Sequence, residues 1–398
     1  MFQSERIKKM ECSPIRKLAE YESIALKKGV NVIHLNIGQP DIPTPTSMID
    51  AVKKYDGVVL KYTDSRGLNN TLETFIEYYS SIGIEFDAKD MIITNGGSEA
   101  LLFSFIAICD IGDEIIVPSP YYSNYNSFAD IAHIKLSPVL STLENNYKLP
   151  SSIELEKAIT NKTKAILISN PCNPTGAVYT KDELLSLLKL AKKYNLYIIS
   201  DEVYREYVYD DLKPMSIYDL NYEKERIILI DSLSKRYSAC GARIGVIASK
   251  NRQLMDNILK LGQSRLCIPL LEQIMASSIL EVPKEYIVNT QILYEKRRNA
   301  VIEALSKVDG VQFSNPRGAF YIIVRLPIKD SDHFSKWLLS DYSLNGETIM
   351  VAPAAKFYGI EGYGLNEIRI SYCLDEAVLI RGINILNEAL IEYKKSFN

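Results

Sequence analysis

Five short apolar segments between residues 91 and 231 constrain the fold more than any other feature of the chain. Each is rich in β-branched residues and too short to form a helix of its own, so we predict a buried strand at each place. Small or polar residues follow each segment. Because ligands of open parallel sheets bind beyond the carboxyl ends of the strands, these residues are predicted to surround a binding site. The segments are residues 91–94, 114–117, 164–169, 195–200 and 226–231.

The last segment leads into the stretch SLSKRYSACGARIG, residues 232–245, which we predict to be a loop at the end of the strand. It carries the hydroxyls of Ser232 and Ser234, then a lysine, Lys235, and then an arginine, Arg243. Hydroxyls and an arginine can bind a phosphate, and a lysine amine can react with an aldehyde. An amine and a phosphate site on one loop suit pyridoxal 5'-phosphate, which needs both.

The order Ser-x-Ser-Lys followed by Gly-x-Arg-x-Gly resembles the lysine signature of the class I and II aminotransferases, and the similarity extends over nearly the whole chain. The resemblance implies a fold-type-I enzyme with pyridoxal 5'-phosphate as cofactor. It also implies that Lys235 is the catalytic lysine and that Ser232, Ser234 and Arg243 bind the cofactor.

Composition and charge restrict the classes of partner. The 398 residues include 49 acidic and 46 basic ones, so with a formal net charge of -3 we expect neither nucleic acid nor an anionic membrane as partner. No apolar run is long enough to span a bilayer, and the first residues lack the apolar core of a signal peptide. The six cysteines form no CxxC pair, so no metal site is predicted. We therefore expect a soluble, cytoplasmic protein.

A glycine turn, NGGS at residues 95–98, joins the first segment to an apolar helical stretch. A strand, a tight turn and a helix start form an anion site, because free backbone N–H groups and the helix dipole point the same way. An ordinary turn with Ser98 as the helix N-cap would have the same sequence, and the missing G-x-G-x-x-G argues against a dinucleotide. The resemblance implies that Gly96, Gly97 and Ser98 form the phosphate cup of the family.

Candidate ring contacts follow the next three segments. Tyr122 follows the second segment, Asn173 lies in NPCNPTG after the third, and Asp201 and Tyr204 follow the fourth. An aromatic ring can stack on a flat cofactor, and a buried carboxylate needs a partner, which could also be a neighbouring arginine. The resemblance implies that Tyr122 stacks on the cofactor, with Tyr121 as the alternative.

By the same resemblance, Asn173 and Tyr204 bind the cofactor's ring oxygen, and Asp201 keeps its pyridine nitrogen protonated. We therefore count Asp201 and Tyr204 with Lys235 as catalytic. The resemblance further implies that Gly38, in LNIGQPDIPTP, lines the substrate pocket. Tyr62, in KYTDSRG, would reach the cofactor phosphate of a second subunit, which implies a homodimer with shared active sites.

Arg369, in NEIRISYC, alternates with isoleucines on a predicted strand, so its side chain points away from theirs. A solvated arginine at a sheet edge would give the same pattern. The resemblance implies that Arg369 binds the substrate α-carboxylate together with Gly38 and Asn173, and that Phe320 packs over the same pocket. A dicarboxylic substrate would need a second cation, for which Arg16 and Arg265 are the candidates.

The expected fold is α/β, with a large doubly wound domain around a mostly parallel sheet and a smaller α+β domain from both chain ends. We predict that residues 1–45 begin the small domain, residues 46–285 form the large domain that binds pyridoxal 5'-phosphate, and residues 286–398 complete the small domain.

The expected activity is transfer of the amino group of an L-amino acid, with aspartate or glutamate preferred, to a 2-oxo acid such as 2-oxoglutarate by a ping-pong mechanism. Two enzymatic alternatives remain open: an aromatic amino acid aminotransferase and a pyridoxal phosphate-dependent C–S lyase, which would release pyruvate and ammonia. A non-catalytic regulator with this body would need an attached DNA-binding domain, for which we expect no room.

Overall fold

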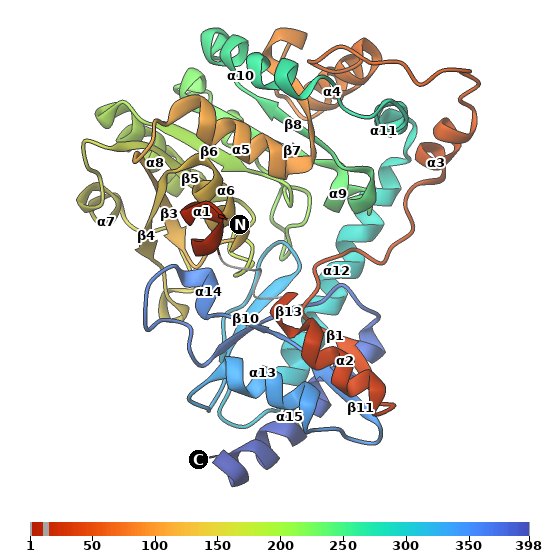
Figure 1. Ribbon diagram of the computed structural model, residues 1–398, viewed down its shortest axis with the longest axis vertical. Coiled ribbons are helices and arrows are strands. Elements are labelled where there is room, and N and C mark those ends of the chain that lie inside the picture. Colours follow the sequence, from red (N-terminus) through yellow and green to blue (C-terminus); the bar gives the residue numbers. More distant parts are fainter. Residues whose placement is uncertain (1, 11–15, 398) are drawn as a thin grey trace.

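The computed structural model describes the backbone of residues 2–10 and 16–397. In Figure 1 this part of the chain forms an upper body around a seven-stranded sheet and a lower body with smaller sheets. The long helix α12 (Lys284–Leu305) runs from the upper body into the lower one. The chain is thus divided between two bodies that share one continuous helix.

The sheet of the upper body has the strand order β2-β8-β7-β6-β5-β3-β4. Strand β8 is antiparallel to both of its neighbours, and the other neighbouring pairs are parallel. The predicted mostly parallel sheet is therefore confirmed. The strands are β2 (Met91–Asn95), β3 (Glu114–Ser119), β4 (Lys135–Leu140), β5 (Thr163–Ser169), β6 (Tyr197–Asp201), β7 (Ile227–Ser232) and β8 (Ile244–Ala248).

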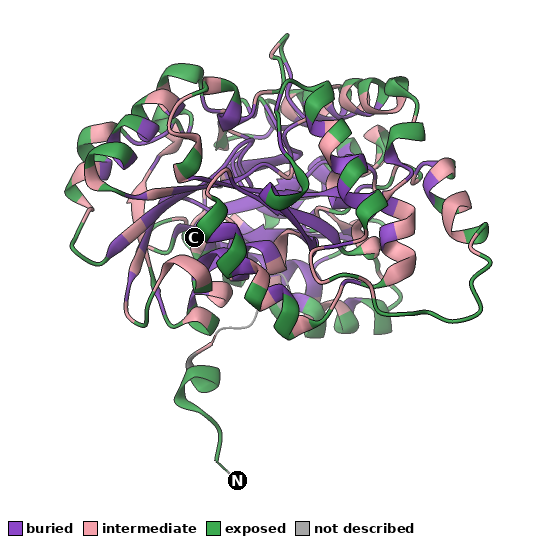
Figure 2. Cartoon of the chain, turned by 90° about the horizontal axis from the view of Figure 1, so that it is seen from above, coloured by how far each residue is buried: buried purple, intermediate pink, exposed green. Residues whose placement is uncertain are grey.

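Successive residues of these strands enter two separate apolar cores, one on each face of the sheet. In β7, Ile227 and Leu229 belong to one core, whereas Ile228 and Ile230 belong to the other. Figure 2 shows the sheet as a buried layer with half-exposed helices on both sides. Uninterrupted apolar strands are what such burial on both faces requires. The helices are α3 (Thr46–Lys53), α4 (Asn69–Ser81), α5 (Gly96–Ile108), α6 (Asn124–Ala132), α7 (Ser152–Lys157), α8 (Lys181–Tyr194), α10 (Arg252–Arg265) and α11 (Leu270–Ala276).

The lower body joins the two ends of the sequence. Strand β1 (Asn31–His34) pairs in parallel with β11 (Glu347–Met350), and an antiparallel sheet has the order β12-β13-β10-β9. The predicted α+β unit from both chain ends is confirmed. Its further elements are β9 (Gln312–Phe313), β10 (Tyr321–Arg325), β12 (Ala352–Pro353), β13 (Glu367–Ser371), α2 (Ala19–Lys27), α13 (Ser331–Ser340), α14 (Ala355–Tyr358) and α15 (Glu376–Phe397). The short helix α1 (Glu5–Lys9) lies beside the upper body, where Arg6 donates to the carbonyl of Ile131 in α6.

Two local predictions were wrong. Lys235 lies on a short helix, α9 (Leu233–Arg236), rather than in a loop, because the Ser232 side chain caps this helix by accepting from the N–H of Ser234. Helix α5 begins at Gly96 with Asn95 at the N-cap position, so Ser98 lies inside its first turn. The glycine turn is therefore itself the beginning of the helix.

The longest described helices, α12 and α15, have 22 residues each. None of the helices within residues 2–10 and 16–397 combines the length and the apolar character that crossing a membrane requires.

Candidate active site

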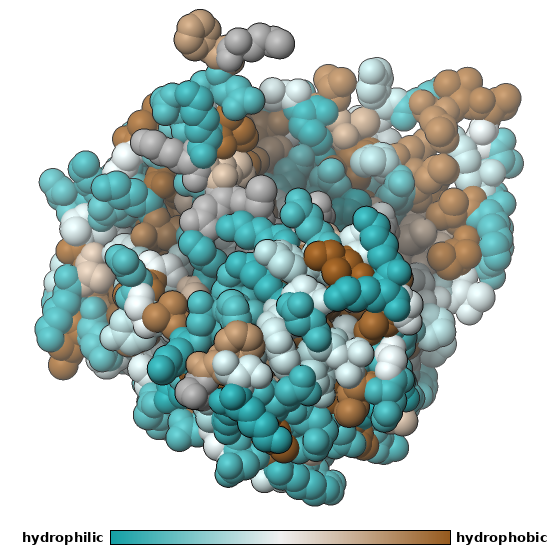
Figure 3. Space-filling model, turned by 60° about the horizontal axis from the view of Figure 1, so that its bottom comes forward, coloured by the Kyte–Doolittle hydropathy of each residue, from teal (hydrophilic) through white to brown (hydrophobic). Residues whose placement is uncertain are grey.

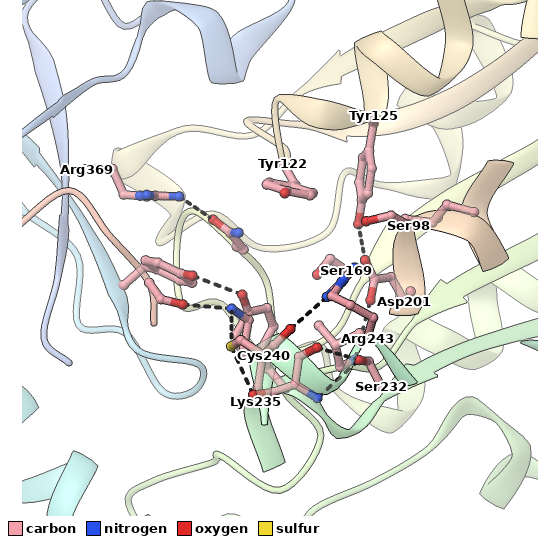
Figure 4. Close-up of a pocket in the computed structure, with 18 residues that line it drawn as sticks. Ser98, Tyr122, Tyr125, Ser169, Asp201, Ser232, Lys235, Cys240, Arg243 and Arg369 are labelled. Carbon is pink, nitrogen blue, oxygen red and sulfur yellow. Dashed lines mark hydrogen bonds between the residues drawn. The ribbon is translucent and has the colours of Figure 1, made fainter. Parts of the chain in front are cut away.

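Most of the predicted site residues meet in one cavity of about 290 Å³, which Figure 4 shows in close-up. It lies at the edge of the upper sheet where the parallel strands end, facing the lower body. Of the predicted set, Gly96 and Tyr62 do not line it. Those that do are Gly38, Gly97, Ser98, Tyr122, Asn173, Asp201, Tyr204, Ser232, Ser234, Lys235, Arg243 and Arg369.

Lys235 enters the cavity from α9. Its Nζ donates to the backbone carbonyl of Gly38 at 2.7 Å and lies 3.7 Å from the Sγ of Cys240. The thiol donates in turn to the carbonyl of Ser234 at 3.1 Å. The lysine thus links α9 to the N-terminal segment that carries Gly38, with the buried ring of Phe320 behind it at 6.0 Å from Nζ to the ring centroid.

A buried ion pair fixes the helix that carries Lys235. The neighbouring side chain, Arg236, is fully buried, and its Nη2 donates to both carboxylate oxygens of Asp231, at 2.8 and 2.7 Å. The hydroxyl of Tyr79 donates to the same carboxylate at 2.8 Å. Because a buried charge without a partner is costly, this pair holds α9 against the end of β7.

The order of three neighbouring strands assembles one end of the cavity. Strand β8 lies between β2 and β7 and is antiparallel to both, so its first residues lie beside the last residues of the other two. Ile244 pairs with Asn95, and Gly245 pairs with Ser232. Arg243, the start of α5 and the serines of the lysine segment therefore meet at this end, which we call the Arg243 end (Gly96–Ser98, Ser232, Ser234 and Arg243).

Close backbone approach explains the glycines of the Arg243 end. A Cβ at Gly245 would lie 2.5 Å from the carbonyl carbon of Gly96. Gly96 itself has φ +70°, and a Cβ there would lie 2.5 Å from Nη2 of Arg243. Gly96 therefore makes room for the guanidinium, while Gly97 and Ser98 face the cavity from the first turn of α5. Unpaired N–H groups of such a turn favour an anion.

Asp201 ends β6 and faces the middle of the cavity. It is buried, and the hydroxyl of Tyr125 donates to its Oδ2 at 2.6 Å. Burial raises the pKa of Asp201 to about 6, while hydrogen bonds from Tyr125 and from the N–H of Val203 act in the opposite direction. The hydrogen-bond partners of this carboxylate are thus a tyrosine and a backbone amide rather than an arginine, so it remains available to a cationic group in the cavity.

Tyr204 reaches the cavity from the segment after β6, and its hydroxyl lies 3.0 Å from that of Tyr321 on β10. Both rings are buried, and burial raises the pKa of each hydroxyl above its ordinary value. Both hydroxyls therefore stay protonated at neutral pH and can donate hydrogen bonds.

Opposite the Arg243 end, the guanidinium of Arg369 enters from β13. Its Nη1 donates to Oδ1 of Asn173 at 3.1 Å and its Nη2 donates to the carbonyl of Asn36 at 2.6 Å. Its Nε has no hydrogen-bond partner among the described residues although the side chain is buried. The ring of Tyr321 lies 4.4 Å from the guanidinium carbon. We call this set, Asn36, Asn173, Tyr321 and Arg369, the Arg369 end.

Of the two aromatic candidates, Tyr122 lines the cavity, and in the view of Figure 4 its ring lies between Arg369 and Asp201. Tyr121 is buried elsewhere and donates to Asn126 at 2.8 Å. Tyr122, rather than Tyr121, is therefore positioned to stack on a bound ring.

Two predicted residues lie away from the cavity, and the structure does not describe the side chain of a third. Tyr62 is 82% exposed. Arg265 donates to the carbonyls of Ser65 and Ile93, at 3.0 and 3.3 Å, and pairs with Glu99 at 3.4 Å, so its charge is engaged outside the cavity lining. The side chain of Arg16 is outside the described part of the structure.

Several lining residues were missed at the sequence level. Tyr125 lies in the first turn of α6, three residues after Tyr122, and this closeness in sequence to a predicted ring contact could have revealed it. Tyr321 and Arg369 lie diagonally on paired strands, because Ile323 is paired with Arg369, and this requires knowing the strand register. The missed residues are Leu101, Tyr125, Ser169, Val203, Cys240 and Tyr321.

Within the described ranges, acidic, cysteine and histidine side chains form no cluster of three or more that could hold a metal ion.

The sequence is similar to known aminotransferases. Residues 30–386 match the family described as Aminotransferase class I and II. The chain is similar to aspartate aminotransferase of Thermotoga maritima, with 36% identity over 81% of this chain and 85% of the relative. It is also similar to aspartate aminotransferase of Pyrococcus horikoshii, with 31% identity over 98% of this chain and 97% of the relative.

The likeness extends to three dimensions. The solved structure of alanine aminotransferase from Pyrococcus furiosus superposes with a TM-score of 0.90 and 29% identity, and covers 98% of this chain and 100% of its own. The family match covers residues 30–386, and the structural likeness covers 98% of this chain. The protein belongs to the class I and II aminotransferases and is a transaminase.

Proposed function

We propose that the protein is a pyridoxal 5'-phosphate-dependent transaminase that moves the amino group of aspartate or glutamate to a 2-oxo acid such as 2-oxoglutarate. One observation carries the proposal: Lys235 lines the same cavity as two arginines, Arg243 and Arg369, which lie on opposite sides of it in Figure 4. An arginine at each side can bind one anionic group, a phosphate at one and a carboxylate at the other. The lysine amine between them lies where the two compounds would react.

The Arg243 end fits the phosphate group. Two hydroxyls, Ser232 and Ser234, and the first N–H groups of α5 are donors at this end. Ser232 Oγ donates its one proton to the Ile244 carbonyl at 2.9 Å and lies 2.9 Å from Ser234 Oγ, so both hydroxyls are held in place before a ligand binds. The Ser234 hydroxyl can donate to the phosphate directly, whereas the Ser232 hydroxyl would have to turn away from the carbonyl. Prior ordering of donors lowers the entropic cost of binding.

The middle of the cavity fits the ring. Tyr122 offers a flat face, Asp201 a carboxylate for the pyridine nitrogen, and Tyr204 and Asn173 donors for the ring oxygen. A carboxylate in this buried position stabilises a protonated nitrogen by charge pairing. When bound, the cofactor supplies an electron-withdrawing ring that makes the substrate's α-proton acidic.

Lys235 moves the proton in this proposal. With the cofactor bound, the amine of Lys235 would act first as the base that takes the proton from the substrate α-carbon and then as the acid that returns it to the cofactor side of the substrate nitrogen. The carbonyl of Gly38, which accepts from Nζ at 2.7 Å, keeps the amine at the cavity wall between these steps. Arg369 binds the substrate α-carboxylate through its Nε, and Asn173 orients the guanidinium.

The names of the relatives support aspartate as amino donor, and they favour the transferase over the lyase. A second carboxylate requires a further donor, because the cations in the cavity lining, Lys235, Arg243 and Arg369, each have a role already. Arg265 is engaged with Glu99, so Arg16 is our candidate for this donor.

We further propose a homodimer in which Tyr62 binds the cofactor phosphate of the partner subunit. The exposed side chain of Tyr62 and its apolar neighbours Val58, Val59 and Leu60, exposed by 62 to 100%, support this. Apolar side chains gather at the upper right of the face in Figure 3, on the side where the segment after α3 runs in Figure 1. Burial of such a patch stabilises an interface.

The domain limits and the cellular location complete the proposal. We propose that residues 1–45 and 286–398 form the small domain and residues 46–285 the large one, which the pairing of β1 with β11 supports. A cytoplasmic location is supported by the five described cysteines, all of which are free thiols.

The test is the absorption spectrum of the purified protein with added pyridoxal 5'-phosphate, followed by single amino acids without an oxo acid. We expect a visible band that disappears on addition of aspartate or glutamate, and no such band in Lys235→Ala. Lys157→Ala, which changes an exposed lysine, is the matched control and should behave like the wild type.

Two outcomes would contradict the proposal. Accumulation of pyruvate and ammonia with an unchanged band would indicate the lyase. A wild-type protein without any band would remove the cofactor from the proposal.

A further inference from the structure

Tyr321 touches three parts of the cavity that come from different segments. Its hydroxyl lies 3.0 Å from the hydroxyl of Tyr204, and its ring packs against the guanidinium of Arg369. A Cβ at Gly38 would collide with its hydroxyl end, so the Gly38 segment lies directly on this ring. Tyr321 belongs to β10 of the lower body, whereas Tyr204 follows β6 of the upper body.

The number of protons limits which of the two hydroxyls donates to the other. Each has one proton to donate and can accept, so only one of the pair donates to the other. If Tyr204 donates to the cofactor's ring oxygen, its own oxygen is left to accept from Tyr321. Both side chains are buried, and water would not easily replace either partner.

We propose that Tyr321 is a positioning residue of the transaminase: it donates to Tyr204 and thereby strengthens the hydrogen bond from Tyr204 to the cofactor's ring oxygen. This inference rests on the proposed function, since it requires the cofactor in this cavity. Hydrogen bonds in a chain polarise one another, so a donor behind Tyr204 makes Tyr204 a better donor. The ring of Tyr321 contributes separately, as a flat support for Arg369.

The consequence concerns the proton on the Lys235 nitrogen when this nitrogen is joined to the cofactor. In the bound cofactor the ring oxygen would lie next to that proton and would attract it. A strong hydrogen bond from Tyr204 reduces the charge on the oxygen, and the proton is then lost at a lower pH. Removing the hydroxyl of Tyr321 should therefore move the pH of this proton loss upward.

Tyr321→Phe tests this with a spectrum rather than with activity. The substitution keeps the ring beneath Arg369 and against Gly38 and removes one oxygen. In the loaded enzyme without substrate, we expect the midpoint of the pH titration of the visible band to rise by about 0.5 to 1 pH unit, the effect of one net hydrogen bond. The KM for the amino acid should change by less than about twofold, because the support of Arg369 is intact.

A double-mutant cycle separates this role from a merely structural one. Tyr204→Phe should raise the midpoint further than Tyr321→Phe, and the double variant should match Tyr204→Phe alone, because Tyr321 acts through Tyr204. An equal shift from Tyr321→Phe with and without the Tyr204 hydroxyl would overturn the proposal, as would an unchanged midpoint. Tyr363→Phe, at a partly exposed tyrosine of the lower body, is the control and should leave the midpoint unchanged.

A separate variant tests whether the ring of Tyr321 supports the guanidinium of Arg369. Tyr321→Leu removes both the hydroxyl and the flat support, so we expect the same shift of the midpoint and, in addition, a rise of about tenfold in the KM for the amino acid. An unchanged KM would overturn the support of Arg369. A wild-type protein without a visible band would instead contradict the proposed function itself, so the two failures are distinguishable.

Discussion

At the Arg243 end the donors lie at the ends of three neighbouring strands of one sheet, whereas at the Arg369 end they come from both bodies of the molecule. Arg369 donates to Asn173, 196 residues away, and to Asn36, 333 residues away. The Arg243 end relies on small residues, hydroxyls and backbone N–H groups. The Arg369 end is a buried cation between aromatic rings, held by an amide and a carbonyl.

Because of this difference, a substitution at one end of the cavity need not disturb the other end. Strand order and the buried Arg236–Asp231 pair together fix the Arg243 end, so its geometry depends on the upper body. The Arg369 end exists only where the lower body and the N-terminal segment meet the upper body. We therefore expect changes at one end to affect cofactor binding and changes at the other to affect substrate binding.

The largest effect is expected for Arg369→Lys. A lysine keeps the charge but loses the planar fork, so it cannot hold Asn36, Asn173 and a carboxylate together. Steady-state kinetics should give a KM about 100-fold higher for both amino acid and oxo acid, with cofactor affinity within about twofold of the wild type. Arg381→Lys, at a half-exposed arginine of α15, is the control, and an equal loss of cofactor from Arg369→Lys would break the comparison.

A smaller effect, on cofactor binding at the Arg243 end, is expected for Arg243→Ala. This side chain is exposed, so solvent weakens its contribution, and we expect the cofactor Kd to rise about tenfold. At saturating cofactor the KM for aspartate should remain within about twofold. Fluorescence titration of the cofactor-free protein measures the Kd. A changed KM with an unchanged Kd would contradict the separation of the two ends.

Between the two ends, Asp201 should make cofactor binding depend on pH. Its pKa in the folded protein is raised to about 6, so in the cofactor-free protein it takes up a proton as the pH falls below that value and can no longer pair with the pyridine nitrogen. We expect binding about fourfold weaker at about pH 5.5 than at about pH 7.5 from this group. Asp201→Asn should lack this part of the dependence, and parallel curves for the two proteins would refute it.

The same shift has a consequence for stability, with the opposite sign from that of an ordinary paired carboxylate. Between about pH 4 and pH 6 the folded, cofactor-free protein binds more protons than the unfolded chain, so its stability falls as the pH rises through this window. Asp201→Asn should flatten that fall in thermal unfolding.

The smallest effect on selectivity is expected for Arg265→Ala. Because this arginine pairs with Glu99 and backbone carbonyls, its removal should change the preference for aspartate over phenylalanine by less than about twofold. The melting temperature should fall instead, since Glu99 loses its ion-pair partner and keeps only the hydrogen bond from the N–H of Asn95. A change of tenfold in preference would mean that Arg265 acts on substrate, in its own or a partner subunit.

The same comparison explains which parts of the site could be predicted from the sequence. Lys235, Asp201 and Asn173 could be found because each follows a strand whose apolar pattern is plain. Tyr321 could not, because its partners depend on the register between β10 and β13 and on the contact between the two bodies. The short helix α9 was missed since its formation depends on Ser232 as a cap and on the buried pair of Arg236, neither of which a local pattern reveals.

The pairing of β1 with β11 also sets the order in which the cavity can form during synthesis on a ribosome. The Arg243 end has all of its residues once position 245 has been made, whereas residues 31–38 must wait for β11 and for Arg369. Contacts over such separations form late, because the cost of closing the intervening loop comes first. We therefore expect a nascent chain to complete its Arg243 end well before its Arg369 end, and Lys235 to obtain its Gly38 contact late.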